Sequence, residues 1–278
     1  MSYLIAVEQL YPQLQAGDWL IVDTRFALGD LAYGEKAYAQ SHLPGAVYLD
    51  LNRDLSGPLA EHGGRHPWPE LPVLLATLRG VGLSNQSRVL IYDDAANMYA
   101  GRLWALLRWL GHEQIFLLDG GWQAWVGAGM PVTADLPEIQ PGDFEPELQP
   151  QFLASVEELR APAPDVVVLD ARSAERYRGE SEPLDARAGH IPGALNRPFA
   201  ENLAGQLFKS PEDLRTEMLA LGLRPEQEII VYCGSGVTAN HTLVALAEAG
   251  FQRGRLYPGS WSDWVSYPDN PIATGPQP

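Results

Sequence analysis

The chain has a single cysteine, Cys233, in a local setting that favours nucleophilic chemistry. The apolar run before it, residues 229–232, predicts a buried strand, and residues 238–249 predict a helix. Gly-Ser-Gly between them predicts a tight loop. A thiol at such a turn lies near loop amides and a helix N-terminus, whose positive partial charge favours the thiolate. The sequence therefore predicts a reactive cysteine, with a buried and inert cysteine as the alternative.

The loop after the cysteine has the composition of an anion-binding turn. Gly234 and Gly236 flank Ser235, and a loop without side-chain bulk lets its backbone N–H groups converge on a ligand. We expect this loop, through Val237 and Thr238, to stabilise charge on the sulfur. The Ser235 hydroxyl can donate a hydrogen bond to a departing group or relay a proton.

Residues 233–239, Cys-Gly-Ser-Gly-Val-Thr-Ala, resemble the active-site loop of the rhodanese superfamily. The form is typical of 3-mercaptopyruvate sulfurtransferases, because the thiosulfate-using branch more often has basic residues where this chain has Gly234 and Ser235. The resemblance implies that sulfur is transferred through a persulfide on Cys233.

The same resemblance implies an arginine that binds the anionic end of the sulfur donor. Arg176 holds the matching position and has no counterpart at that spacing in the first half of the chain. A planar guanidinium suits a carboxylate or a sulfonate-like group. A solvated surface arginine is the alternative for Arg176. Arg187, nearer to the following histidine motif, is a second candidate.

In the mercaptopyruvate branch, the serine that matches Ser235 is proposed to act with a histidine and an aspartate from the first domain. Residues 62–69 supply His66 as the candidate histidine, and a purely structural histidine is the alternative. The family's aspartate falls on Asn52, whose amide can orient an imidazole but cannot stabilise its cation as a carboxylate does. Asp50 or Asp54 could substitute.

Composition restricts the class of protein. The formal charge of −16 opposes general binding to nucleic acid or to an anionic membrane, and no apolar run is long enough for a membrane span. One cysteine precludes an internal disulfide, and the six histidines show no close metal-ligand pattern, so we expect no metal or organic cofactor. Nothing near the N-terminus resembles a secretory signal, which predicts a cytoplasmic protein.

The elements that position these residues occur twice, because the two halves of the chain repeat each other. The matching segments are residues 21–25 with 168–172, 41–46 with 189–194, 89–93 with 229–233, and 120–125 with 259–264. Each half alternates short apolar strands with helical stretches, which predicts an α/β fold with a mostly parallel sheet flanked by helices. We expect two tandem rhodanese-like domains, residues 1–133 and 152–278, joined by a Pro-rich, acidic linker at 134–151.

The repeat also separates structural motifs from catalytic ones. Asp93 stands where the second half has Cys233, and an aspartate cannot form a persulfide. We therefore expect a catalytically silent first domain that covers the site and shapes its pocket. His42 and His190 occur in both halves, which favours a role as hydrogen-bonded loop anchors. The Asp-x-Arg motifs of both halves are expected to be structural ion pairs.

The expected function is transfer of sulfane sulfur from a small anionic donor, 3-mercaptopyruvate, to a thiophilic acceptor. No second thiol can take the sulfur from Cys233, so the acceptor is external: cyanide, a small thiol or a thioredoxin-like protein. The alternatives are a thiosulfate:cyanide sulfurtransferase and a non-catalytic sulfur-carrier or regulatory module. A cysteine-dependent phosphatase would need an arginine where the chain has Ala239, which argues against that class. Dinucleotide binding is set aside because no Gly-x-Gly-x-x-Gly motif follows a predicted strand.

Overall fold

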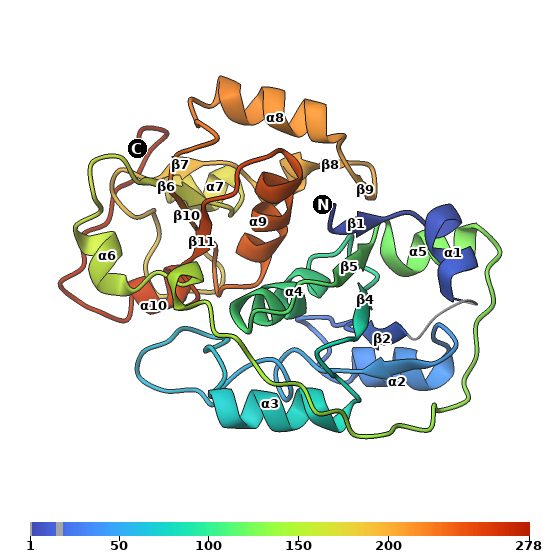
Figure 1. Ribbon diagram of the computed structural model, residues 1–278. Coiled ribbons are helices and arrows are strands. Elements are labelled where there is room, and N and C mark those ends of the chain that lie inside the picture. Colours follow the sequence, from blue (N-terminus) through green and yellow to red (C-terminus); the bar gives the residue numbers. More distant parts are fainter. Residues whose placement is uncertain (1, 15–18) are drawn as a thin grey trace. The chain divides into compact units, whose positions relative to one another are not determined.

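The computed structural model describes residues 2–14 and 19–278, and the chain divides into two compact units (Figure 1). The first unit comprises Met1–Gly57 and Pro69–Gln149, and the second comprises Pro58–Trp68 and Pro150–Pro278. Each crossing between units therefore occurs at a proline, where the chain cannot continue a helix or donate a backbone hydrogen bond. The division follows the sequence halves except for residues 58–68, which belong to the second unit although they precede most of the first.

The first unit is built on a parallel sheet. Among its described residues the strand order is β1-β5-β4-β2-β3. The strands are β1 (Leu4–Ile5), β2 (Trp19–Asp23), β3 (Ala46–Tyr48), β4 (Arg88–Tyr92) and β5 (Ile115–Leu118). The central strand β4 is apolar and buried at four of its five positions, as expected for a parallel strand covered on both faces.

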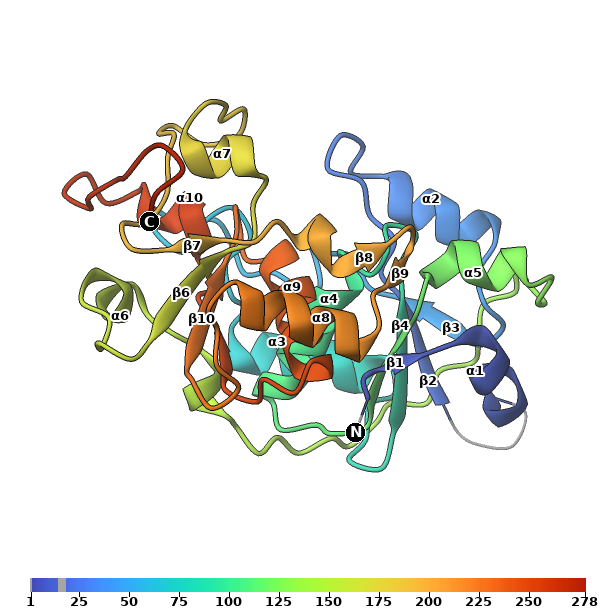
Figure 2. The same cartoon turned by 90° about the horizontal axis from the view of Figure 1, so that it is seen from above.

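Helices cover both faces of this sheet (Figure 2). They are α1 (Val7–Leu14), α2 (Tyr33–Gln40), α3 (Leu71–Gly80), α4 (Ala100–Trp109) and α5 (Gly121–Gly127). One core cluster joins Leu10 of α1, Tyr38 of α2 and Trp125 of α5 to Leu90 of the sheet. Helix α4 is buried at each position from 100 to 107.

The second unit repeats the arrangement. Its main sheet has the order β11-β10-β6-β7, with neighbouring strands parallel, and a short antiparallel hairpin of β8 and β9 lies apart from it. The strands are β6 (Val167–Asp170), β7 (Leu195–Asn196), β8 (Leu203–Ala204), β9 (Leu207–Phe208), β10 (Ile229–Tyr232) and β11 (Gly254–Leu256).

Helices α8 and α9 lie on one side of this sheet and α6 on the other (Figure 2). The helical elements are η1 (Pro150–Phe152), α6 (Val156–Arg160), α7 (Ala174–Arg178), η2 (Phe199–Asn202), α8 (Pro211–Ala220), α9 (Thr238–Glu248) and α10 (Ser260–Trp264). Trp261 and Trp264 of α10 are buried in the core with Tyr232. The predicted fold class, two α/β domains with parallel sheets and flanking helices, is confirmed.

The stretch predicted as a linker is fixed to the first unit for most of its length. Residues 134–149 form no helix or strand, but the amides of Gly142, Phe144 and Glu147 donate hydrogen bonds to carbonyl groups of that unit. Phe144 is buried. The segment is therefore extended yet held in place.

Both repeated polar motifs are structural, as predicted. Arg25 and Arg172 each form a buried bidentate pair with the aspartate two residues earlier. His42 bonds the carbonyl of Tyr38, and His190 bonds the carbonyl of Tyr177. No helix of the described residues is long and apolar enough to cross a membrane.

Candidate active site

Cys233 lies at the end of β10, in the turn that leads to α9, and its side chain is buried. The backbone of the cysteine is fixed by the first residues of α10 (Ser260–Trp264). Its N–H donates to Ser260 Oγ (3.1 Å), and its carbonyl accepts from the amide of Trp261 (2.9 Å). The thiol is therefore held at a strand-loop-helix junction, as the apolar run and the glycines indicated.

The loop stabilises negative charge on this sulfur. Burial raises the pKa of the Cys233 thiol, but hydrogen bonds from the Thr238 hydroxyl and from the amides of Ala239, Ser235 and Val237 outweigh it and leave the pKa lowered. A lowered thiol pKa gives more of the thiolate, which is the nucleophilic form.

The two glycines of the loop have different roles. Gly236 adopts φ +71°, and a Cβ there would lie 2.0 Å from the carbonyl oxygen of Pro258, so only glycine fits. A Cβ at Gly234 would instead meet the guanidinium nitrogens of Arg65 and Arg176 at 3.0–3.3 Å. The missing side chain of Gly234 thus leaves space beside Cys233 over which two cations lie.

Residues 58–68 reach this site because they form part of the second unit. The amide of Gly63 donates to Asp263 (2.7 Å), and the amide of Arg65 donates to Ser262 Oγ (3.1 Å). Gly64 has φ +78°, and a Cβ there would clash with the Gly259 carbonyl at 2.4 Å. This close approach fixes the residues that follow it.

The segment brings His66 to Ser235. A hydrogen bond of 2.8 Å joins His66 Nδ1 to Ser235 Oγ, and both residues are buried. Because the Ser235 amide also contacts the sulfur, the hydroxyl of the same residue lies next to the nucleophile. The serine and histidine expected from the sequence therefore meet in one hydrogen-bonded pair.

The third member of that expected relay falls in the first unit. Asn52 is exposed. The Asp50 carboxylate accepts hydrogen bonds from the amides of Asn52 and Arg53, and Asp54 accepts from the Asp50 amide and pairs with Arg53. Both carboxylates are engaged within their own turn.

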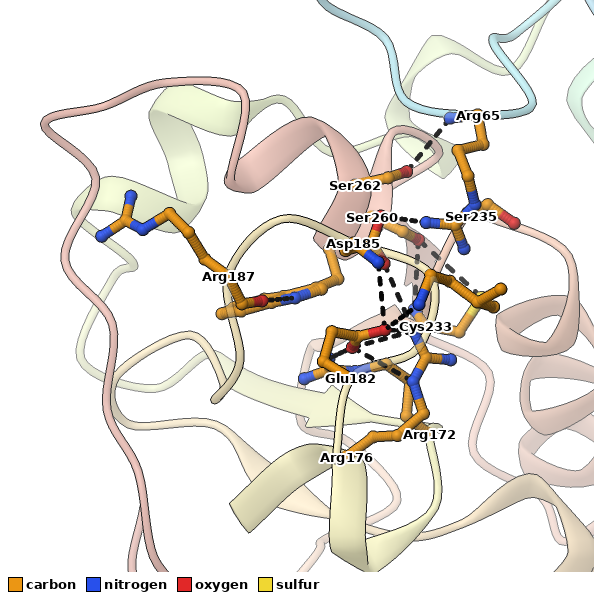
Figure 3. A network of polar contacts seen from close by, with 12 residues as sticks. Arg65, Arg172, Arg176, Glu182, Asp185, Arg187, Cys233, Ser235, Ser260 and Ser262 are labelled. Carbon is orange, nitrogen blue, oxygen red and sulfur yellow. Dashed lines mark hydrogen bonds and ion pairs between the residues drawn. The ribbon is translucent and has the colours of Figure 1, made fainter. Parts of the chain in front are cut away.

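Arg176, on α7, is held by two carboxylates of the loop that follows (Figure 3). Its Nε and Nη2 donate to Glu182 (2.8–3.1 Å), and Nη2 also donates to Asp185 (3.2 Å). Both carboxylates are buried, whereas the arginine side chain keeps 19% of its surface exposed. The guanidinium is thus aimed beside Cys233 but remains accessible.

Arg65 is a site residue that the sequence patterns did not identify. It forms an ion pair with Asp185 through Nη1, opposite Arg176 on the same carboxylate (Figure 3). Its place next to His66 gave no signal, since adjacent side chains of an extended segment point to opposite sides.

The Arg187 side chain does not join Cys233, Ser235 and Arg176, the other residues predicted for the site. Its guanidinium points away from the cluster in Figure 3 and bonds the carbonyl oxygens of Pro268 and Asn270 at 3.4 Å. Its own carbonyl oxygen accepts from the indole of Trp261 (2.9 Å). The contacts of Arg187 within the described residues therefore fix the C-terminal loop.

Ser260 is a second contact that was not predicted. It has φ +55°, a left-handed conformation that is uncommon for a residue with a side chain. Its Oγ lies 3.9 Å from Cys233 Sγ and donates to the Tyr257 carbonyl (3.0 Å). The sequence repeat gave a signal for this conformation, because the residue of the first half that matches Ser260 is Gly121, and glycine readily adopts a left-handed conformation.

None of the described residues forms a group of three or more His, Cys, Asp or Glu side chains that could hold a metal ion. The chemistry that this arrangement can perform is that of a stabilised thiolate, a neighbouring hydroxyl bonded to an imidazole, and guanidinium groups that bind an anion.

Comparison with known proteins agrees with these features. The model of the Rhodanese-like domain matches residues 6–128 and 155–267. A Pseudomonas aeruginosa protein described as a probable 3-mercaptopyruvate sulfurtransferase is 45% identical over 280 residues, covering 99% of each chain. The thiosulfate sulfurtransferase of Azotobacter vinelandii is 30% identical over 275 residues, covering 98% of this chain and 97% of that protein.

The crystal structure of SseA from Escherichia coli, a 3-mercaptopyruvate sulfotransferase, matches with a TM-score of 0.81 and 29% identity, over 94% of this chain and 100% of that one. The family model covers both halves of the chain, and the Cys233 loop lies in its second match. The chain therefore belongs to the rhodanese family, with one rhodanese-like domain in each half.

Proposed function

We propose that the chain is a sulfurtransferase that moves sulfane sulfur from 3-mercaptopyruvate to a thiol or cyanide through a persulfide on Cys233. The observation that carries the proposal is the position of the Cys233 sulfur, in a loop whose hydroxyl and amides stabilise its anion, beside the Ser235–His66 pair. The names of the curated relatives support the same reaction class.

In the first half-reaction the Cys233 thiolate attacks the sulfur of the donor thiol. The new S–S bond forms as the C–S bond breaks, and the bonding electrons leave on carbon as the enolate of pyruvate. The proton of the donor thiol is then delivered to that carbon, which completes pyruvate and leaves the persulfide as an anion. The hydrogen-bonded Ser235 and His66 are suited to move this proton.

In the second half-reaction an external thiolate or cyanide attacks the outer sulfur of the persulfide. The S–S bond breaks, its electrons return to Cys233, and the thiolate is regenerated. Thiols of this kind are kept reduced in the cytoplasm, so we propose that the protein works there.

Donor charge favours mercaptopyruvate. Its single carboxylate can be matched by the accessible guanidinium of Arg176, whereas the dianion thiosulfate gains from basic residues in the loop itself, where this chain has Gly234 and Ser235. The thiosulfate reaction is the second candidate, favoured by the identity to the Azotobacter enzyme.

The first unit has Asp93 at the matching position and is proposed to be catalytically silent.

The test is sulfur transfer to cyanide, read as thiocyanate, with mercaptopyruvate and thiosulfate compared on one preparation. We expect a kcat/KM at least about tenfold higher with mercaptopyruvate and none above background in Cys233→Ser. A preference for thiosulfate would reverse the donor assignment. Activity with neither donor would overturn the proposed function and favour a sulfur-carrier role.

A further inference from the structure

Three guanidiniums and three carboxylates form one connected network beside Cys233 (Figure 3). The network runs from Arg65 to Asp185, from Asp185 to Arg176, from Arg176 to Glu182, and from Glu182 through Arg172 to Asp170. The formal charges cancel. The network is therefore close to neutral when all six groups are ionised.

Two of the three cations of this network, Arg65 and Arg176, reach solvent, whereas Arg172 and the carboxylates that pair with these cations are buried. The side chains of Arg65 and Arg176 are 30% and 19% exposed, whereas those of Asp185 and Glu182 are 4% and 3% exposed. An incoming anion thus meets the guanidiniums first, with the carboxylates behind them.

The two exposed guanidiniums keep hydrogen-bond donors for such an anion. Arg65 uses Nη1 for Asp185, and Arg176 uses Nε and Nη2 for the carboxylates. In the part of the chain that the structure describes, Arg65 Nη2 and Arg176 Nη1 have no partner. These two nitrogens lie 3.0 and 3.1 Å from the point where a Cβ of Gly234 would be. Both are therefore directed at the space next to the nucleophile.

We propose that Arg65 and Arg176 together bind the donor's anionic group and that Asp185 sets the charge of donor that this pair accepts. Asp185 bridges the two guanidiniums, and its negative charge repels a bound dianion about twice as strongly as a single carboxylate, so the pair suits the single carboxylate better. The inference rests on the proposed function, since it assigns the donor-binding part of that site. It adds Arg65, from a segment far from the cysteine in sequence, as a donor-binding residue.

The first test is the Asp185→Asn variant, which removes one negative charge and keeps a side chain of the same size. We expect the ratio of kcat/KM for thiosulfate to that for mercaptopyruvate to rise about tenfold or more, because the dianion gains twice the interaction of the monoanion. The increase should shrink with added salt, since the pair is partly exposed. A ratio within twofold of wild type would overturn the role of Asp185.

The second test is Arg65→Gln, which changes the charge in the opposite direction. We expect KM to rise about tenfold or more for both donors and the thiosulfate-to-mercaptopyruvate ratio to fall. The opposite sign is the discriminating result, because two variants that merely damaged the fold would not move the ratio in opposite directions. An unchanged KM would remove Arg65 from the donor site.

Arg178 and Glu180 provide matched controls near the same helix. They form an exposed ion pair with each other, outside the network. Arg178→Gln and Glu180→Gln change the net charge by the same amounts and should leave the ratio within twofold; a tenfold effect in either control would contradict a local origin. Wild-type protein that forms no Cys233 persulfide with either donor would refute the proposed function itself, which separates that failure from failure of the charge assignment.

Discussion

The loop after β4 in the first unit and the loop after β10 in the second are versions of one structure with different anions at their centre. In the first, the Asp93 carboxylate accepts hydrogen bonds of 2.7–2.9 Å from four backbone amides, those of Ala95, Asn97, Tyr99 and Ala100. In the second, the Cys233 sulfur is stabilised by amides at three of the same offsets, those of Ser235, Val237 and Ala239.

The difference shows what the fold supplies and what the side chain adds. A turn with converging amides holds a negative group in both units. The Asp93 carboxylate completes the turn and cannot accept sulfur; its burial raises the pKa of this carboxyl, and the hydrogen bonds from the loop amides oppose that shift. By the proposed mechanism, the charge on Cys233 moves to the outer sulfur of the persulfide and returns to Cys233 when that sulfur is transferred, so the same kind of turn would serve catalysis.

The residue facing each loop differs as well. Gly121 and Ser260 occupy matching positions and share φ +55°. A Cβ at Gly121 would lie 2.2 Å from the Asp93 carbonyl, so glycine is required there. The second unit accommodates a side chain instead, and its hydroxyl contacts the cysteine.

The largest expected effect comes from giving the second loop the anion of the first. Cys233→Asp should retain the fold, because the loop amides can donate to a carboxylate, and should lower sulfur transfer by at least about 10³-fold, because no persulfide can form. Thiocyanate production and circular dichroism measure the two properties. Sulfur transfer near the wild-type rate would break the comparison.

The two loops should also differ in how much their central side chain contributes to the free energy of unfolding. Asp93→Ala removes the acceptor of four backbone amides, two of them in buried hydrogen bonds, and should lower the free energy of unfolding of the first unit by about 3 kcal/mol. Cys233→Ala removes a small side chain and should cost about 1 kcal/mol. Urea unfolding of both variants tests this order, and equal losses would show that the two loops depend equally on their central anion.

The pKa of Cys233 provides a test of the loop's charge stabilisation. Because hydrogen bonding lowers the pKa, the thiolate should persist at pH values where an unperturbed cysteine is protonated. Thr238→Val removes the hydroxyl that contributes most to the lowering and should move the titration to higher pH. Thiolate absorbance against pH, with Cys233→Ser as the blank, measures both midpoints; a wild-type midpoint at or above that of a free cysteine would contradict the assignment.

The smallest expected effect is that of Ser260→Gly, which gives the second unit the residue of the first. Glycine relieves a left-handed conformation, so stability should be unchanged or slightly higher. Loss of the hydroxyl near the sulfur should lower kcat by about threefold to tenfold with little change in KM. A variant with wild-type kcat would limit Ser260 to a structural role.

Local patterns were sufficient to predict the fold and the place of Cys233 between a strand and a helix. Strand β10, residues 229–232, is a continuous apolar run, and α9 begins at Thr238, as the switch in periodicity after Gly-Ser-Gly indicated. The tandem repeat added the second domain, since a motif that appears twice at similar spacing needs two similar frameworks.

The surroundings of the nucleophile depended on contacts that no local pattern encodes. Arg65 and Asp185 are 120 residues apart and meet because residues 58–68 belong to the second unit. Arg187 was the second candidate for binding the donor because it lies near the histidine motif in sequence, but its guanidinium bonds carbonyl groups of the C-terminal loop. Charge pairing depends on the direction of long side chains, which tertiary packing decides.

The most direct measurement is the mass of the peptide that contains Cys233 after the protein meets one equivalent of 3-mercaptopyruvate without an acceptor. The account predicts a gain of one sulfur atom on Cys233, release of pyruvate in equal amount, and loss of the added mass when cyanide follows. An unmodified Cys233 together with released pyruvate, or sulfur transfer retained by Cys233→Ser, would contradict a persulfide on this residue.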